Sequence, residues 1–203
     1  MHISEGVLSA PVLLSGVALT VAGTAIGLKK LNYDRIPQVA ILSAAFFVAS
    51  LVHVPVGPSS VHLILNGLMG ILLGWVAFPA ILIALALQAV LFQFGGLTSL
   101  GVNAFNMAMP AVLCYYVFGA WVKSDNSGFA VPASFLAGFG AMLLAGLLTG
   151  LSLVCTGQSF LSAAQVIVAA HLPVMVVEGV FTAVCVQFLK KVRPEVLDVV
   201  YAD

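Results

Sequence analysis

Long apolar runs, separated by short polar or Gly/Pro-rich segments, make up most of this chain. Seven of them approach the length of roughly 20 residues that a helix needs to cross a bilayer core. They cover residues 11–28, 36–54, 61–78, 80–94, 104–122, 129–154 and 166–189. The pattern predicts an all-α, polytopic membrane protein with seven transmembrane helices, forming a single transmembrane domain over residues 1–203.

Composition supports this fold class and excludes others. The chain is 62% hydrophobic and 7% charged, whereas a soluble domain carries roughly 25% charged residues. A net charge of zero gives no reason to expect a nucleic-acid partner. No basic segment precedes the first apolar run, so we expect no cleaved signal peptide. Three isolated cysteines fit small buried hydrophobic positions better than a disulfide framework.

The basic residues predict the orientation. All seven Lys and Arg lie in the segments 29–35, 123 and 190–193, and with seven spans these segments fall on one side. By the positive-inside rule that side is the cytoplasm. The N-terminus is then extracellular and the C-terminus cytoplasmic, and all four histidines lie in the outer half. Such an arrangement is typical of a site that receives a cation from outside a cell membrane.

The extracellular N-terminal segment, residues 1–8, has a specific chelating pattern. The α-amine of Met1, the backbone nitrogen of His2 and the His2 Nδ1 can close fused chelate rings around one ion. A divalent ion that tolerates a square plane, nickel or copper first, then needs one more donor. The alternative is that His2 is an ordinary residue of a frayed terminus.

The extracellular loop over residues 55–61 is rich in Gly, Pro and Ser and ends beside a histidine. Gly57 and its flanking prolines predict a turn that no helix continues through. Ser59 or Ser60 can cap the next span, which would place His62 in its first helical turn. There the imidazole stays neutral, the form that a metal needs. We expect His62 to supply the fourth nitrogen; the alternative is an interfacial histidine.

Four other polar residues near the outer side are candidates for supporting roles. His53, at the end of the second span, is a candidate further ligand or a group that hydrogen-bonds a ligand, and Ser60 is a candidate for the second role. Asn103 and Asn106 lie near the outer end of the fifth span. Their amides could hold the ordered loop or fix the tautomers of the ligand rings.

The last span carries two more candidates. His171 and Glu178 are seven residues apart and therefore share a helix face. His171 is a candidate additional ligand. Glu178 is the only acidic residue inside a span, and because a lone carboxylate in lipid is costly, it should face protein. It is either a structural carboxyl or a contact for a partner.

Three motifs resemble one known family. They are the opening Met-His-Ile-Ser-Glu-Gly, the run from Gly57 to Leu63 that leads to Asn66-Gly67, and Ala170-His171-Leu172-Pro173 followed by Glu178-Gly179. They resemble the CbiM/NikM family, the substrate-capturing membrane subunits of energy-coupling factor (ECF) transporters for nickel and cobalt. The resemblance spans nearly the whole chain and implies a seven-helix bundle with an inserted N-terminus. It implies Ni²⁺ or Co²⁺ as the transported substrate, held by Met1, His2 and His62.

The resemblance also implies partners. This chain has no P-loop, so ATP hydrolysis would fall to two separate ATPase subunits joined through a transmembrane coupling subunit, in a prokaryotic plasma membrane. A small accessory membrane protein would be a separate chain. Two alternatives are an ECF-type capture subunit for an organic vitamin and an intramembrane metalloenzyme. The second lacks an HExxH motif and a general base near the outer surface.

Overall fold

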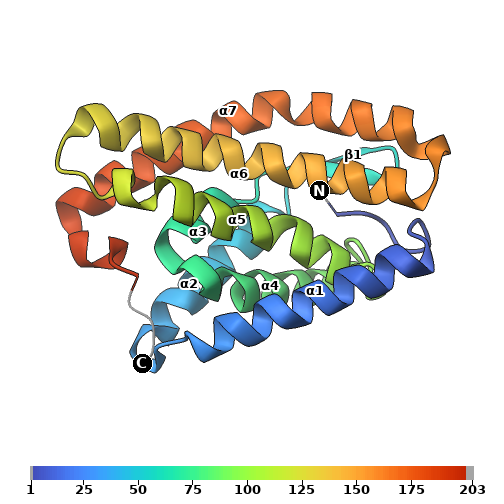
Figure 1. Cartoon of the computed structure of the whole chain (residues 1–203), viewed down its shortest axis with the longest axis horizontal. Coiled ribbons are helices and arrows are strands. Elements are labelled where there is room, and N and C mark those ends of the chain that lie inside the picture. The colour runs from blue at the N-terminus through green and yellow to red at the C-terminus, as the bar shows by residue number, and fades with distance from the viewer. Residues whose placement is uncertain (1, 200–203) are drawn as a thin grey trace.

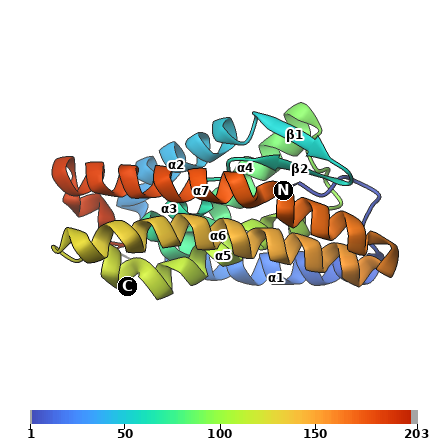
Figure 2. The ribbon, with the colours of Figure 1, turned by 90° about the horizontal axis from the view of Figure 1, so that it is seen from above.

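The protein, represented by a computed structural model that describes residues 2–199, is mainly helical (Figure 1). The α-helices are α1 (Ala10–Lys29), α2 (Ile36–Ala49), α3 (Asn66–Leu73), α4 (Ala77–Phe92), α5 (Leu100–Val122), α6 (Ser127–Thr156) and α7 (Leu161–Val192). Short 3-10 segments are η1 (Tyr33–Arg35), η2 (Gly74–Val76), η3 (Gln158–Phe160) and η4 (Pro194–Leu197), and one hairpin pairs β1 (His53–Val56) with β2 (Ser59–His62). The long helices lie alongside one another in an elongated bundle, with α6 beside α7 in both views (Figures 1 and 2).

Five helical stretches in the described residues are long and apolar enough to cross a membrane. They are α1, the stretch Asn66–Phe92, α5, α6 and the stretch Gln158–Val192. The α2 helix has 14 residues, fewer than the roughly 20 that a perpendicular crossing needs. Large apolar side chains on α1 and α7, such as Leu14 and Val184, are more than 60% exposed, as expected of helices that face lipid. The chain is therefore a membrane protein.

Residues 53–62 form a β-hairpin, so the predicted spans 36–54 and 61–78 were wrong at these ends. The register pairs His53 with His62 and Val56 with Ser59. Gly57, with φ of 55°, is the first of the two central turn residues, where a II′-type hairpin turn requires a positive φ. The apolar valines of the hairpin prolonged the hydrophobic runs, which is why the sequence suggested longer helices.

The segment between the hairpin and α3 is capped from another helix. His62 ends β2 four residues before α3 begins, so it does not lie in a first helical turn, and neither Ser59 nor Ser60 caps α3. The Glu178 carboxylate on α7 takes this role. Its Oε1 accepts the backbone N–H of Ile64 at 2.5 Å and of Leu65 at 2.8 Å.

Glycines let the central helices approach closely. Every residue of α3 is buried. A Cβ placed on Gly67 of α3 would lie 2.5 Å from the Cα of Gly138 on α6, and one on Gly138 would lie 2.5 Å from the carbonyl oxygen of Glu178 on α7. Small residues at such crossings allow tight packing of membrane helices. This packing fixes α3 against α6 and α6 against α7, and it thereby places the Glu178 cap beside the start of α3.

The basic segments meet at one end of the bundle, where α5 and α7 end and α1 leads into α2 (Figure 1). Arg35 donates to the carbonyl oxygen of Glu195 at 3.0 Å. Lys123 pairs with Asp198 at 3.1 Å, and Lys190 donates to the carbonyl oxygen of Val122 at 3.2 Å. These contacts connect the segments that carry the chain's lysines and arginines, which agrees with the predicted charge asymmetry.

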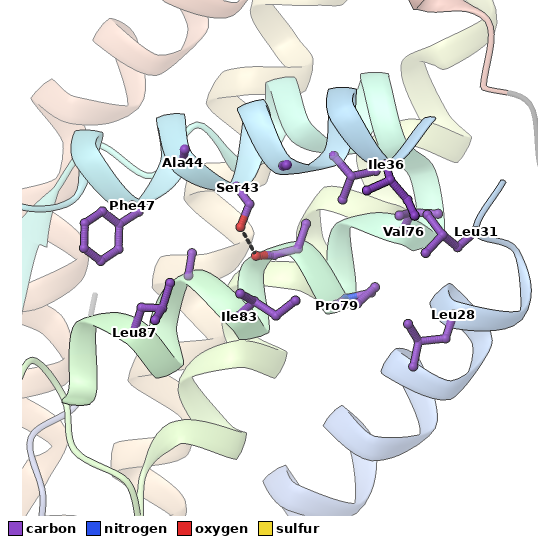
Figure 3. Close-up of a pocket in the computed structure, with 14 residues that line it drawn as sticks. Leu28, Leu31, Ile36, Ser43, Ala44, Phe47, Val76, Pro79, Ile83 and Leu87 are labelled. Atoms are coloured by element: carbon purple, nitrogen blue, oxygen red, sulfur yellow. Dashed lines mark hydrogen bonds between the residues drawn. The ribbon is translucent and has the colours of Figure 1, made fainter. Parts of the chain in front are cut away.

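An apolar groove of about 450 Å³ separates α2 from α4 near the end of α1 (Figure 3). One hydrogen bond crosses it, from Ser43 Oγ on α2 to the Ala80 carbonyl oxygen on α4, at 2.8 Å. Leu28 and Ile36 lie toward one end of the groove, and Phe47 lies toward the other (Figure 3). The lining suits a surface covered by lipid.

Candidate metal centre

The N-terminal segment, residues 2–9, is docked into the bundle. His2 and Ile3 are buried. The Asn103 side chain on α5 holds both backbone groups of Ile3, since Oδ1 accepts its N–H at 2.9 Å and Nδ2 donates to its carbonyl oxygen at 3.1 Å. Ser99 Oγ donates to the same carbonyl at 2.9 Å, and the Ser4 N–H donates to the Pro58 carbonyl oxygen at 3.1 Å. Residues 2–9 are therefore not a frayed terminus. Met1 lies outside the described residues.

The docked segment brings two histidines together. The ring centroids of His2 and His62 lie 4.6 Å apart, with an interplanar angle of 31°. Both side chains are at least 95% buried. The His2 ring comes from the docked segment and the His62 ring from the end of β2. The fold therefore brings together two residues that are 60 positions apart in the sequence. The two imidazoles that the sequence suggested as metal ligands are thus neighbours.

Gln88 on α4 determines which nitrogen of His2 is protonated. The Gln88 Nε2 group donates to the Phe47 carbonyl oxygen at 2.9 Å and to Ser50 Oγ at 2.5 Å. A carbonyl can only accept, so this amide end is the NH₂ group and Oε1 is the end that faces His2. Oε1 lies 2.8 Å from His2 Nε2, which must therefore carry the proton. Nδ1 of His2 keeps a free lone pair, as a chelate with its own backbone nitrogen requires.

The other three histidines have the opposite tautomer. Each donates from Nδ1 to a backbone carbonyl oxygen: His53 to Leu51 at 3.1 Å, His62 to Leu63 at 2.9 Å and His171 to Ile167 at 2.6 Å. In the neutral ring the lone pair then lies on Nε2. The Nδ1–H tautomer of His62 therefore places the lone pair of its neutral ring on Nε2.

Burial keeps both central imidazoles neutral. It lowers the pKa of His2 from 6.5 to about 3 and the pKa of His62 well below 6.5. Desolvation disfavours the charged imidazolium, and this is the main cause of both shifts. A neutral ring is the form that coordinates a metal, so no proton has to leave these side chains at neutral pH.

The remaining candidate residues outside α7 make different contacts around this pair. His53 is the cross-strand neighbour of His62 and packs edge-on against Phe94, with ring centroids 4.3 Å apart. Ser60 is buried on β2. Asn106 donates to Ser152 Oγ on α6 at 3.1 Å, so this hydrogen bond joins two helices and does not reach the docked segment.

The two candidates on α7 are both fully buried. His171 lies in the helix against which β2 packs, and its Nε2 has no hydrogen-bond partner among residues 2–199. Glu178 faces protein, as its cost in lipid predicted, and it holds the backbone two and three residues after His62. Its contacts are those of a structural carboxylate.

Sequence reasoning did not identify Gln88. The residue lies inside an apolar run, and its contacts come from residues more than 35 positions away in the sequence. A usable signal was present, because a lone amide within a lipid-crossing run must find hydrogen-bond partners inside the protein. The nature of those partners could not be inferred from the run itself.

A conventional metal site made only of side chains is absent from residues 2–199. No group of three or more His, Cys, Asp or Glu residues there is arranged to hold an ion. The pair of imidazoles supplies two donors, and backbone nitrogens, the terminal amine or water can supply the others. The backbone and amine nitrogens are the donors that the N-terminal sequence suggested.

Known proteins that are similar to this chain are named as metal transport proteins. The profile of CbiM, described as the cobalt uptake substrate-specific transmembrane region, matches residues 2–196. A putative metal transport protein of Haemophilus influenzae is 44% identical, covering 98% of this chain and 97% of that protein. A putative fused nickel transport protein NikMN of Archaeoglobus fulgidus is 30% identical, covering 98% and 68%. A crystal structure of a truncated transition metal transporter superposes with a TM-score of 0.80 at 28% identity, covering 94% of this chain and 99% of that one.

Proposed function

This chain belongs to the CbiM family of nickel and cobalt transport proteins, and we propose that it captures a single Ni²⁺ or Co²⁺ ion at its docked N-terminus for import. The observation that carries the proposal is the buried pair of His2 and His62. Both rings are neutral, and the hydrogen bonds of His2 and His62 define the tautomer of each ring.

Four nitrogens would hold the ion. They are the amine of Met1, the backbone nitrogen of His2, His2 Nδ1 and one imidazole nitrogen of His62. An all-nitrogen, near-planar set suits low-spin nickel(II), while cobalt(II) accepts the same donors. Raw affinity would favour copper, so selectivity would come from the geometry that the docked segment imposes. Binding would release protons from the terminal amine.

The small size of the polar cavity beside His2 favours an ion over a vitamin. This cavity has a volume of about 190 Å³, whereas sites for organic ligands typically occupy about 300–1,000 Å³. Its lining includes His2 and His53, and imidazole is a common ligand of nickel and cobalt.

The rest of the transport cycle would depend on partners. We propose that the chain acts as the substrate-binding subunit of an ECF-type transporter, with a transmembrane coupling subunit, two ATPase subunits and, where present, a small accessory membrane protein. Seven crossings with the N-terminus outside remain our proposed topology. The gathering of the basic segments at the end away from the His2–His62 pair supports it.

The test is the metal content of purified protein with a native, untagged N-terminus. Nickel and cobalt would be supplied in parallel, beside a variant with one extra residue before Met1 and the variant His62→Ala. We expect one ion per chain for the native form and loss of that ion in both variants. Equal metal content in the extended form would overturn the terminal-amine site.

A further inference from the structure

The polar cavity beside His2 extends from the surface to the imidazole of His2. The cavity of about 190 Å³ lies between the docked segment, the hairpin and the connection from α4 to α5. Its polar lining consists of the side chains of His2, Ser4, His53, Ser59, Ser60 and Gln93. Among residues 2–199, no acidic side chain lines it, so nitrogen, hydroxyl or carbonyl oxygen, or water would bind a cation held there.

Exposure along the lining changes from one end of the cavity to the other. Ser4 and Gln93 are exposed and form the rim, whereas Ser59 and His2 are at least 95% buried and form the floor. His53 is half-buried and lies between these extremes. The cavity is therefore a route from the surface to the imidazole of His2.

The floor contains a hydroxyl without a hydrogen-bond partner among residues 2–199. Ser59 is 96% buried, and its Oγ makes no hydrogen bond there. A buried hydroxyl is costly unless something bonds to it. Because Ser59 lines the cavity, water or a hydrated solute in the cavity is the group that can do so.

His53 can offer a donor atom within this route. Its Nδ1–H donates to the Leu51 carbonyl oxygen, so the lone pair of the neutral ring lies on Nε2. The ring stands edge-on to Phe94, which also lies beside His2 at a centroid distance of 6.2 Å. His53 and His62 are directly paired in the hairpin, so their side chains project from the same face.

We propose that this cavity is an access chamber in which the hydrated divalent transition-metal ion is first held. His53 Nε2 replaces one metal-bound water, and the Ser59 hydroxyl hydrogen-bonds to a water that remains on the ion. The ion then passes to His2 and to His62, and each new nitrogen releases one more water. Every step is a ligand exchange without redox chemistry. The proposal rests on metal capture by the His2–His62 pair and adds the route by which the ion reaches it.

An access residue has a kinetic signature that a final ligand lacks. Because His53 would bind the ion only in passing, it would speed binding and release by the same factor and leave the dissociation constant unchanged. A final ligand or a residue needed for the fold would instead change the dissociation constant. Rate measurements therefore separate the roles.

The experiment is stopped-flow binding of aqueous Ni²⁺ and Co²⁺ to the full chain with its native N-terminus. The variants are His53→Gln, which keeps a polar side chain without an imidazole, and Ser59→Ala, which removes the unpartnered hydroxyl. The matched control is Val54→Ala, a neighbouring hairpin position whose side chain is 64% exposed. We expect His53→Gln to slow association by roughly 10-fold, with dissociation slowed in proportion. Ser59→Ala should slow association by a smaller factor. Val54→Ala should bind and release the ion at the rates of the native chain.

Three results would overturn the proposal. An unchanged association rate in His53→Gln would show that the ion does not use this donor. A raised dissociation constant with an unchanged association rate would make His53 a final ligand. Failure of the native chain to bind either ion would remove the proposed function and the access chamber together, whereas native binding with unaffected variants would remove only the chamber. Should His53→Gln not fold, Ser59→Ala carries the same test, because removing an unpartnered hydroxyl should not destabilise the chain.

Discussion

His2 Nε2 and Gln88 Oε1 lie 2.8 Å apart, and the amide can only accept in this contact. The other end of the Gln88 amide is committed to the Phe47 carbonyl oxygen and to Ser50 Oγ. The protonation of the His2 ring is therefore set by α2 and α4 and not by the metal. A ligand prepared in its coordinating tautomer does not have to rearrange when an ion arrives.

Replacing Gln88 should weaken metal binding through this contact. Gln88→Leu removes the acceptor, frees the His2 ring to rotate or change tautomer, and should lower affinity by about 10–100-fold. Gln88→Glu keeps an acceptor oxygen and should retain more affinity than Gln88→Leu. Isothermal titration with Ni²⁺ measures both.

Gln38 provides the matched control for this experiment. Its side chain lies at the basic end of the bundle, near the Val196 carbonyl oxygen. Gln38→Leu should leave metal affinity unchanged. If Gln88→Leu also binds with native affinity, the glutamine has no part in preparing His2.

Asn103 should control the docking of the N-terminal segment. Asn103→Ala removes two hydrogen bonds to the Ile3 backbone. At about 1 kcal/mol each, their loss would weaken docking by about 2 kcal/mol, or roughly 30-fold. Amide hydrogen exchange of residues 2–9 should then rise, and metal affinity should fall in parallel.

The control for Asn103 is Asn126, which accepts the backbone N–H of Gly128 at 2.9 Å in the connection before α6. Asn126→Ala removes the same kind of contact far from the segment, and it should leave exchange of residues 2–9 unchanged. Increased exchange in both variants would indicate general loosening of the bundle, which would contradict a specific role for Asn103.

Acidification should destabilise the metal-free protein through the histidine pair. The folded pKa of His2 is about 3 and that of His62 is also lowered, whereas the unfolded value is 6.5. The unfolded chain therefore binds protons that the folded chain excludes, and stability falls as pH drops below 6.5 toward 3. At pH 5.5 the loss is on the order of 1 kcal/mol for His2, and His62 contributes in the same direction. The temperature of the unfolding midpoint in detergent should decrease when the pH is lowered from 7.5 to 5.5.

Comparison with His62→Gln isolates this contribution. The variant removes one of the two titrating rings, so its midpoint should change less over the same pH interval. An equal pH dependence in the native chain and in His62→Gln would assign the effect to other groups.

Much of the helical framework could be predicted from the sequence because bilayer-length apolar runs leave few alternatives. The predicted spans 11–28, 104–122, 129–154 and 166–189 each fall within one helix. The hairpin over residues 53–62 was not predicted because its valines and prolines are as apolar as the last residues of a membrane-spanning helix. Length and hydropathy alone do not distinguish a short apolar hairpin from the last turns of a span.

The sequence suggested His2 and His62 as candidate ligands and Asn103 as a support for the ordered segment, but it did not suggest Gln88. His2 stood out because its chelating atoms lie within two consecutive residues, and His62 stood out by its position after a Gly/Pro/Ser-rich loop. The contact between Gln88 and His2 joins residues 86 positions apart. Such a contact depends on how α4 packs against the docked segment, and no local pattern in the sequence encodes that packing.

Glu178 should stabilise the fold at the point where β2 leads into α3. Its Oε1 accepts two buried backbone N–H groups, from Ile64 and Leu65, and its side chain is fully buried. Glu178→Ala leaves both donors unpaired, at about 1–3 kcal/mol each, so the free energy of unfolding should fall by about 2–6 kcal/mol. Glu178→Gln keeps the accepting oxygen and should lose much less. Denaturant unfolding in detergent measures both variants. Because these donors lie two and three residues after His62, Glu178→Ala should also weaken Ni²⁺ binding. Equal destabilisation by both substitutions would show that the charge of the carboxylate, and not its geometry as a cap, holds this junction.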